Sequence, residues 1–162
     1  MEQFPESRLK VRFSDCDPFN HLNNASYIDY LITAREDHLL DNYGFDIYRY
    51  AMEKGVSWVV SQNRIAYLLP ANLSETVLVR SCLLKWGEKD TLVEMQMWDE
   101  QGKSLKALLW TTFVHYDLVR KRSAVHSEEL TQRFSGLQVS PLVTAGFEER
   151  IAMLKEQATA AN

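Results

Sequence analysis

The apolar positions between residues 24 and 41 recur at helical spacing. Residues three and four apart share one face of a helix, and the apolar stripe contains Tyr27, Ile28, Leu31, Ile32, Ala34, Leu39 and Leu40. Asn23 or Asn24 can cap the start of this helix, and Gly44 marks its exit. The wide apolar face predicts a helix packed deeply against a sheet. A short second helix is predicted over residues 46–54.

Strand-like runs, rich in β-branched and aromatic residues, occupy most of the rest of the chain up to residue 117. One run, residues 9–13, precedes the long helix. Four more follow it, at residues 56–69, 76–86, 91–99 and 104–117. Tight turns around Gly87 and Gly102 join the last three runs, as in an antiparallel meander. This order predicts an α+β fold, in which a helix covers one face of a large antiparallel sheet.

The C-terminal part has a different pattern. Residues 138–146 contain Ser, Pro and Gly and are typical of a linker. Phe147, Ile151 and Leu154 then form a narrow helical stripe, which predicts a short helix that either docks on the body of the protein or frays, with an interaction helix as the alternative. We therefore divide the chain into a domain at residues 1–135 and a linker with a helical tail at residues 136–162.

Composition and charge narrow the function classes. The chain has 162 residues, 46% of them hydrophobic, which suits one domain with a sizeable core. Its net charge is −4 and its basic residues are scattered, so we expect neither a nucleic acid nor an anionic membrane surface as partner. Cys16 and Cys82 form no CxxC pair, which favours a reducing cytoplasm. No signal peptide or membrane-spanning run is predicted.

The junction between the first strand and the long helix is unusually polar. Residues 14–27 contain two carboxylates, one imidazole and three carboxamides, from Asp15, Asp17, His21, Asn20, Asn23 and Asn24. A helix cap needs fewer polar groups than this, so a chemical role is indicated. Asp17 before Pro18 can also be a simple turn former. Asp15, Asp17 and His21 can be interpreted as metal ligands, but no further ligand set stands out, and we expect no metal.

The order and spacing of several motifs along the chain resemble those of the hotdog-fold thioesterases. The most similar subgroup is the 4-hydroxybenzoyl-CoA thioesterase-like acyl-CoA thioesterases. The resemblance covers roughly residues 8–130. The matching motifs are Asp15-Cys16-Asp17-Pro18, His21-Leu22-Asn23-Asn24, Val59-Val60-Ser61-Gln62-Asn63, Tyr67-Leu68-Leu69-Pro70, and Asp117 followed by three basic residues. The resemblance implies a hotdog fold, in which the antiparallel sheet wraps around the long helix.

The resemblance also implies an activity, the hydrolysis of acyl-CoA thioesters to a free acid and CoA. Such a reaction needs a nucleophile or a base for water, donors for the developing oxyanion, and a grip on the acyl carrier. The family assigns the first role to Asp17. The amides at the start of the helix suit the second. Coenzyme A would enter as part of the substrate, with no other cofactor, and the protein would be a homodimer or homotetramer with active sites at the subunit interface.

Other residues are candidates for supporting roles. We expect Asn24 and His21 to orient water or the carbonyl as part of the catalytic set, and His21 can also move a proton. The alternatives are a helix cap for Asn24 and a structural histidine for His21. The candidates for substrate binding are Asn23, which is either a cap or a site residue, Tyr27, which can instead serve only in helix packing, and Gln62 and Asn63. The basic run Arg120, Lys121 and Arg122 is a candidate anchor for the CoA phosphates, with a solvated turn as the alternative.

Two positions depart from the family pattern. The residue before the His is commonly Gly and here is Asn20, which tolerates left-handed backbone angles better than most residues. Some relatives carry Asn where this chain has Phe19. These departures favour an alternative, a non-catalytic acyl-thioester binding module of the same fold. A hydratase or dehydratase, with His21 and Asp17 as an acid/base pair, is a third hypothesis.

Overall fold

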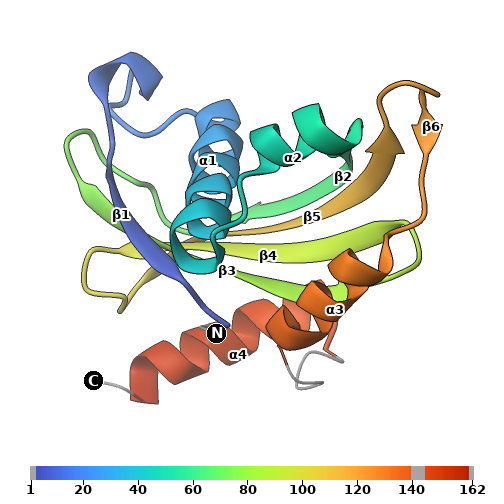
Figure 1. Ribbon diagram of the computed structural model, residues 1–162. Coiled ribbons are helices and arrows are strands. Elements are labelled where there is room, and N and C mark those ends of the chain that lie inside the picture. The colour runs from blue at the N-terminus through green and yellow to red at the C-terminus, as the bar shows by residue number, and fades with distance from the viewer. Residues whose placement is uncertain (1–2, 140–144, 161–162) are drawn as a thin grey trace.

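A single antiparallel sheet forms the body of the protein (Figure 1). The computed structural model describes residues 3–139 and 145–160. The strand order is β1-β3-β4-β5-β2, and the short β6 pairs with the end of β5. The strands are β1 (Glu6–Lys10), β2 (Val56–Tyr67), β3 (Thr76–Trp86), β4 (Asp90–Asp99), β5 (Leu105–Asp117) and β6 (Arg122–Ser123). The predicted α+β hotdog architecture is confirmed.

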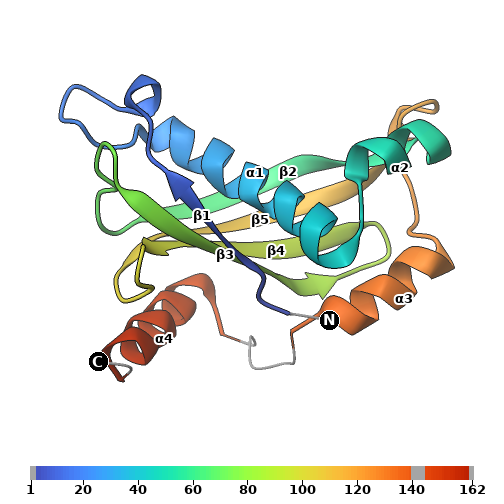
Figure 2. The same cartoon turned by 60° about the vertical axis from the view of Figure 1, so that its left-hand side comes forward.

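The long helix α1 (Asn24–Tyr43) crosses the inner, concave face of the sheet (Figure 2). Asn23 caps its start, because its side chain accepts a hydrogen bond from the Ala25 N–H at 3.0 Å. Gly44 ends it with a left-handed φ of 62°, which costs glycine nothing. The helix extends two residues beyond the predicted end. The predicted second helix is α2 (Ile47–Lys54), capped by Asp46.

The main core lies between α1 and the inner face of the sheet. Leu31 and Ala34 of α1 are fully buried, as are Val79, Met95 and Leu109 of β3, β4 and β5. The stripe of α1 that faces the sheet also contains Arg35 and His38, both buried. Leu40, which the helical pattern placed on the apolar face, is 50% exposed.

Helix α3 (Glu128–Leu137) was not predicted from the sequence. Ser127 caps its start, and Phe134 and Leu137 pack in the inner core beside β3. Leu130 is buried as well. Three apolar positions in ten residues gave too weak a stripe to predict a helix. At the start of the predicted linker, the Val139 N–H donates to the Leu83 carbonyl of β3. Residues 140–144 of that linker lie outside the described residues.

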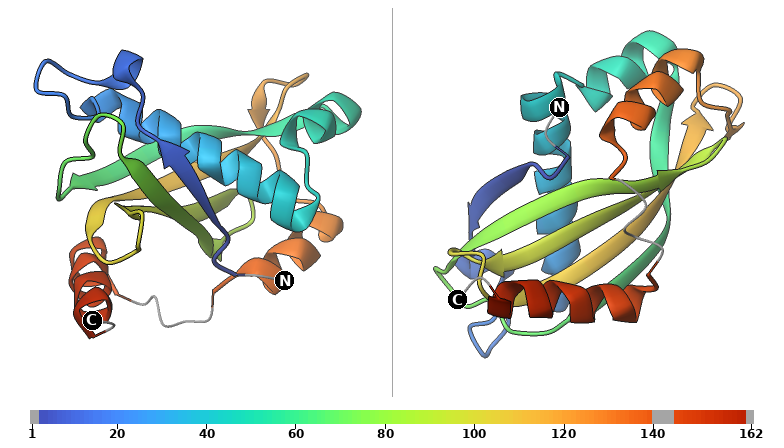
Figure 3. Two further views of the ribbon diagram at one scale, coloured as in Figure 1. Left: turned by 90° about the vertical axis from the view of Figure 1, so that its left-hand side faces the viewer. Right: turned by 90° about the horizontal axis from the view of Figure 1, so that it is seen from below.

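Helix α4 (Phe147–Ala160) packs on the opposite, outer face of the sheet (Figure 3, right). Phe147, Ile151 and Leu154 contact an outer cluster that includes Leu78 and Leu108. The docking helix predicted from this stripe is confirmed. The expectation of a single covered face is wrong, because the outer side chains of β3 and β5 are apolar as well and α4 shields them.

The first strand also differs from its prediction. β1 covers Glu6–Lys10 rather than residues 9–13, and Phe13–Asp15 instead form a short 3-10 turn, η1. The Val11 N–H still donates to the Glu75 carbonyl, so the chain leaves the sheet just beyond β1. This early exit carries residues 16–23 over the start of α1, where the polar cluster lies.

Candidate active site

The loop of residues 16–23 is a tight turn fixed on both sides by backbone hydrogen bonds. Within it, the Asp17 N–H donates to the His21 carbonyl at 2.8 Å. Two further bonds join the loop to residues outside it. The Leu22 N–H donates to the Ala71 carbonyl at 2.8 Å, and the Asn20 carbonyl accepts a hydrogen bond from the Leu73 N–H at 2.9 Å. The loop is therefore held against the segment that connects β2 to β3.

Asn20 makes this turn possible. Its φ of 59° lies in the left-handed region, where most residues other than glycine are strained. Asparagine is one of the side chains that adopt this conformation at low cost. The expectation that Asn20 can replace the family's glycine here is confirmed at the level of the backbone.

The Asp17 carboxylate is oriented by the loop itself. Its Oδ1 accepts hydrogen bonds from the N–H of Phe19 at 2.9 Å and from the N–H of His21 at 3.1 Å. Within the described parts of the chain, Oδ2 has no hydrogen-bond partner. One oxygen thus fixes the side chain, and the other is available to a ligand.

A cavity of about 230 Å³ opens beside this carboxylate. Its walls are Asp17, His21 and Leu22 of the loop, Asn24 and Tyr27 of α1, and residues 67–70 after β2. Four predicted site residues, Asp17, His21, Asn24 and Tyr27, therefore lie around one cavity.

The start of α1 forms the polar wall of the cavity. The Asn23 side chain accepts a hydrogen bond from the Ala25 N–H. The Asn23 carbonyl accepts hydrogen bonds from the N–H groups of Ser26 and Tyr27. The Asn24 N–H has no hydrogen-bond partner among residues 3–139 and 145–160. It is one of the unpaired amides at a helix start, where the helix dipole is positive. This wall can stabilise a negatively charged oxygen.

Two tyrosines join the helix to the segment after β2. Tyr27 is buried, and its hydroxyl accepts a hydrogen bond from the Ala71 N–H at 2.9 Å. Burial raises the pKa of this hydroxyl, so it stays neutral. Tyr67 packs edge-on against the Tyr27 ring, with 5.2 Å between centroids, and donates to the Asn24 carbonyl at 3.0 Å. Both side chains thus set the position of the first turn of α1.

Tyr67 was missed as a site residue. The motif Tyr67-Leu68-Leu69-Pro70 supported the family resemblance, and that signal could have placed Tyr67 at the site. Its hydrogen bond to Asn24 forms only because the end of β2 lies against the start of α1. The sequence pattern of a single strand does not reveal this contact.

Asp15 has a scaffolding position. Its Oδ2 accepts a hydrogen bond from the Tyr30 hydroxyl at 2.7 Å, and its carbonyl accepts one from the Asn23 N–H. Burial, and then the hydrogen bond to this carboxylate, raise the pKa of Tyr30. In the described regions, no group of three His, Cys, Asp or Glu side chains is arranged to hold a metal ion.

The remaining predicted site residues do not line this cavity in a single chain. Asn23 is occupied as the helix cap. Gln62 is exposed on β2, and the Asn63 Oδ1 accepts a hydrogen bond from the Thr111 hydroxyl at 2.7 Å. Neither side chain lines the cavity.

The basic run Arg120, Lys121 and Arg122 lies at the opposite end of the sheet. It follows Asp117, whose register partner is Val56 at the start of β2, whereas the cavity lies at Tyr67 at the end of β2. Strand geometry puts about 35 Å between these two ends. Within one chain, the predicted phosphate anchor does not reach the Asp17 cavity.

Comparison with known proteins agrees with this geometry. Residues 11–134 match the family model of the thioesterase-like superfamily. The chain belongs to the thioesterase-like superfamily. The predicted resemblance to hotdog-fold thioesterases is thereby confirmed.

Three relatives illustrate this membership. The chain is 27% identical over 128 residues to the long-chain acyl-CoA thioesterase FadM of Escherichia coli, covering 79% of this chain and 95% of that protein. A probable thioesterase from Escherichia coli, YbaW, has a similar structure, with a TM-score of 0.71 and 26% identity over 83% of this chain and 98% of that one. The hypothetical protein TT1821 from Thermus thermophilus gives a TM-score of 0.75 at 25% identity, over 85% and 99% of the two chains.

No helix within the described residues is both long enough and apolar enough to cross a bilayer.

Proposed function

We propose that this protein hydrolyses acyl-CoA thioesters to a free acid and CoA, with Asp17 as nucleophile or general base. One observation carries the proposal. The Asp17 carboxylate lines a cavity beside the start of α1, with Oδ1 fixed by two N–H groups and Oδ2 unpaired within the described chain. The similarity to the long-chain acyl-CoA thioesterase FadM supports the substrate class.

The cavity contains groups suited to the two chemical needs of the reaction. A thioester carbonyl placed at the first turn of α1 would accept a hydrogen bond from the Asn24 N–H, which stabilises the oxyanion as it develops. Asp17 then either attacks the carbonyl carbon to give a mixed anhydride, which water cleaves, or removes a proton from an attacking water. The leaving thiol has a pKa of about 8.5, so it departs with little help from an acid.

His21 and Asn24 are assigned orienting roles. The His21 backbone is fixed by its N–H bond to Asp17, and its side chain lines the same cavity. From that position the imidazole can orient water or move a proton. The Asn24 side chain is exposed at the cavity and can orient the carbonyl or water.

The third need is a binding site for the phosphates of CoA, and this need is met if two chains pair through β2. This strand is an edge of the sheet, and its residues 59–64 are all exposed, including Val59 and Val60 at 41% and 45%. Unpaired edges with exposed apolar residues are ready to pair with another strand. We propose a homodimer in which β2 pairs antiparallel with β2 of the partner, and which can assemble further into a tetramer.

This pairing would complete the site. A two-fold axis in the middle of the exposed run places the start of one β2 beside the end of the other. The basic run at residues 120–122, which adjoins the start of β2, then approaches the partner's Asp17 cavity. Gln62 and Asn63 would lie near the axis. The CoA phosphates would thus contact the basic run of one chain while the thioester lies at Asp17 of the other.

A thiol-release assay tests the activity. Wild-type protein is incubated with acyl-CoA esters that span short, long and aromatic acyl groups, and with an acyl-carrier-protein thioester. We expect catalytic release of free thiol from at least one acyl-CoA. In parallel, calorimetry measures the affinity for a non-hydrolysable acyl-CoA. Tight binding without thiol release on any substrate would contradict hydrolysis and favour the binding module. Formation of a double bond, or addition of water to one, would instead indicate the hydratase or dehydratase.

A further inference from the structure

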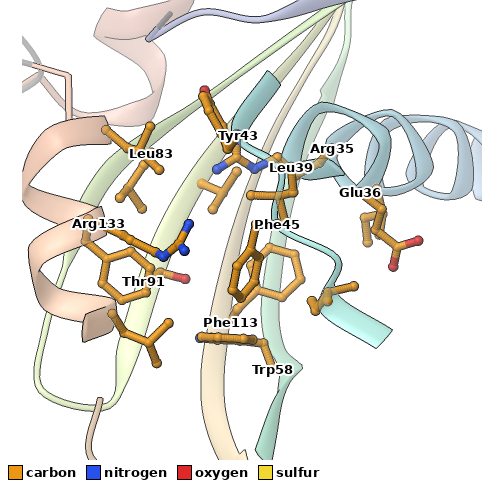
Figure 4. Close-up of a pocket in the computed structure, with 16 residues that line it drawn as sticks. Arg35, Glu36, Leu39, Tyr43, Phe45, Trp58, Leu83, Thr91, Phe113 and Arg133 are labelled. Atoms are coloured by element: carbon orange, nitrogen blue, oxygen red, sulfur yellow. The ribbon is translucent and has the colours of Figure 1, made fainter. Parts of the chain in front are cut away.

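A second cavity, of about 130 Å³, lies under the C-terminal half of α1, away from Asp17. It is bounded by α1, by α3 and by the inner face of the sheet. Figure 4 shows aromatic rings of Phe45, Trp58 and Phe113 around its lower part. Arg35 lies eleven residues after Asn24 on α1, which corresponds to about 16 Å along the helix axis. The two cavities therefore occupy different parts of the molecule.

The Arg35 guanidinium forms part of the wall of this apolar cavity. Arg35 is only 6% exposed, and its Nη1 donates to the Ser81 hydroxyl at 3.1 Å. Its guanidinium carbon lies 5.8 Å from the centre of the Tyr43 ring. No carboxylate in the described parts of the chain forms an ion pair with it. Fully buried arginines are rare unless they are paired, because a buried charge without a counter-charge is costly.

The hydrogen-bond network around Arg35 supplies no negative charge. His38 bonds through Nδ1 to the same Ser81 hydroxyl at 2.7 Å and through Nε2 to the Ser7 hydroxyl at 3.0 Å. Burial and the neighbouring Arg35 lower the pKa of His38 to about 4, so this imidazole is neutral at physiological pH. The charges of Asp41 and Glu6 also act on His38, but neither carboxylate forms an ion pair with Arg35. The groups hydrogen-bonded around Arg35 are therefore one cation and neutral partners.

A second guanidinium faces the same space. Figure 4 shows Arg133 of α3 extending into the cavity from the wall opposite α1. It lies 5.5 Å from the centre of the Phe45 ring, and its ion pair with Glu129 is long, at 3.7 Å. The cavity-lining carboxylate, Glu36, accepts a hydrogen bond from the Tyr48 hydroxyl and points away from both guanidinium groups.

We propose that this cavity binds a small hydrophobic carboxylic acid as its carboxylate. The carboxylate would accept hydrogen bonds from Arg35 and Arg133, and the apolar part would lie among Phe45, Trp58 and Phe113. A dry cavity of about 150 Å³ in another protein holds benzene, so this one suits a single ring or a short alkyl chain. The site is separate from Asp17, and the inference does not depend on the reaction proposed there.

Calorimetric titration with benzoate and hexanoate tests the proposal, with benzyl alcohol and hexanol as neutral analogues. We expect saturable binding of one acid per chain, and binding at least about tenfold tighter than that of the matching alcohol, as a charge-assisted hydrogen bond implies. Arg35→Gln should weaken acid binding by about tenfold or more and leave alcohol binding unchanged within experimental error. The exposed control Arg49→Gln, on α2, should bind like wild type.

Asp17→Asn locates the ligand. It should leave acid binding unchanged, whereas an acid bound in the Asp17 cavity would respond to the loss of the carboxylate. If Arg35→Gln does not fold, Arg133→Gln on the half-exposed wall is the second variant, and it should weaken the acids more than the alcohols. Any one of three results would overturn the proposal. They are no acid binding at millimolar concentration, equal binding of acids and alcohols, and unchanged acid binding in the arginine variants.

Discussion

Arg150 of α4 and Glu94 of β4 form an ion pair on the outer face of the sheet, with Nη2 and Oε1 2.8 Å apart. Glu94 is fully buried, and Arg150 is only 6% exposed. The Glu94 carboxylate also accepts hydrogen bonds from Nε2 of Gln96 at 2.6 Å and from Nε1 of Trp110 at 2.8 Å. Gln96 and Trp110 are strand residues, whereas Arg150 belongs to α4, so the buried Glu94 carboxylate has this cation beside it only while α4 is docked.

Removal of one member of this pair should be costly. Arg150→Met leaves the Glu94 carboxylate buried without its cation, and we expect the free energy of unfolding to fall by about 3–5 kcal/mol. Urea denaturation followed by circular dichroism measures the change. Adding Glu94→Gln to this variant removes the charge, and we expect the double variant to recover part of the loss.

The ion pair of Arg64 with Glu148 is a matched control, because it also joins the sheet to α4. Its side chains are 57% and 76% exposed, so Arg64→Met should cost less than about 1 kcal/mol. Similar losses in Arg64→Met and Arg150→Met would show that burial of the Glu94 pair does not stabilise the docked helix.

The buried His38 should make stability depend on pH. Its pKa of about 4 in the folded state lies below its ordinary value of 6.5, so between these values the unfolded chain binds a proton that the folded chain does not. The contribution of His38 to the unfolding free energy should therefore be constant above pH 6.5. It should decrease by about 3 kcal/mol as the pH falls from 6.5 to 4. Urea titrations of wild type and His38→Gln measure the difference.

Other histidines contribute their own pH dependence, so the difference between the two curves is the relevant quantity. Burial also lowers the pKa of His126, and that effect is common to both proteins. If wild type and His38→Gln lose stability equally between pH 6.5 and 4, His38 does not remain neutral in the folded state.

Much of the fold could be predicted because its signals are local. The stripe of α1, the asparagine cap and Gly44 fix one helix, and runs of β-branched residues fix the strands. Other features depend on contacts between distant segments. Arg35 and His38 belong to the buried stripe of α1, but their polarity hides them until Ser81 and Ser7 are seen to provide partners.

The candidate site also combines residues that a local pattern predicts with residues whose position depends on distant contacts. The polar cluster before α1 made Asp17, His21 and Asn24 candidates, because all of them lie within eight residues, and the structure places all three around one cavity. The hydrogen bond of Tyr67 depends on the far end of β2 lying against α1, and the proposed role of the basic run would require a partner chain. Neither is visible in a local pattern. The predicted cytoplasmic location stays a prediction.

Tyr67→Phe isolates the hydrogen bond that holds the first turn of α1. The variant keeps the ring packed on Tyr27 but removes the donor to the Asn24 carbonyl. We expect a loss of about 1 kcal/mol in stability and a fall in kcat greater than any change in KM, because the oxyanion donor is less well positioned. Tyr48→Phe, which removes an exposed bond to Glu36, should leave both constants unchanged. Wild-type kcat in Tyr67→Phe would exclude this positioning role.

Mixed dimers test whether two chains build one site. One chain carries Asp17→Asn, and the other carries Arg120→Gln, Lys121→Gln and Arg122→Gln. In the mixed dimer, one site combines an intact Asp17 with an intact basic run, so about half of the wild-type activity should return at low substrate concentration. Light scattering confirms the dimer. If mixing restores no activity above that of the separate variants, the basic run does not serve the partner's site.

The turnover of Asp17→Asn tests the central claim most directly. The substitution keeps the Oδ1 acceptor for the two loop N–H groups but removes the negative charge. Asp29→Asn, exposed on α1, is the matched control, and circular dichroism verifies folding of both. In the thiol-release assay, we expect kcat of Asp17→Asn to fall by at least about 100-fold while Asp29→Asn matches wild type. A folded Asp17→Asn protein with wild-type turnover would contradict the account.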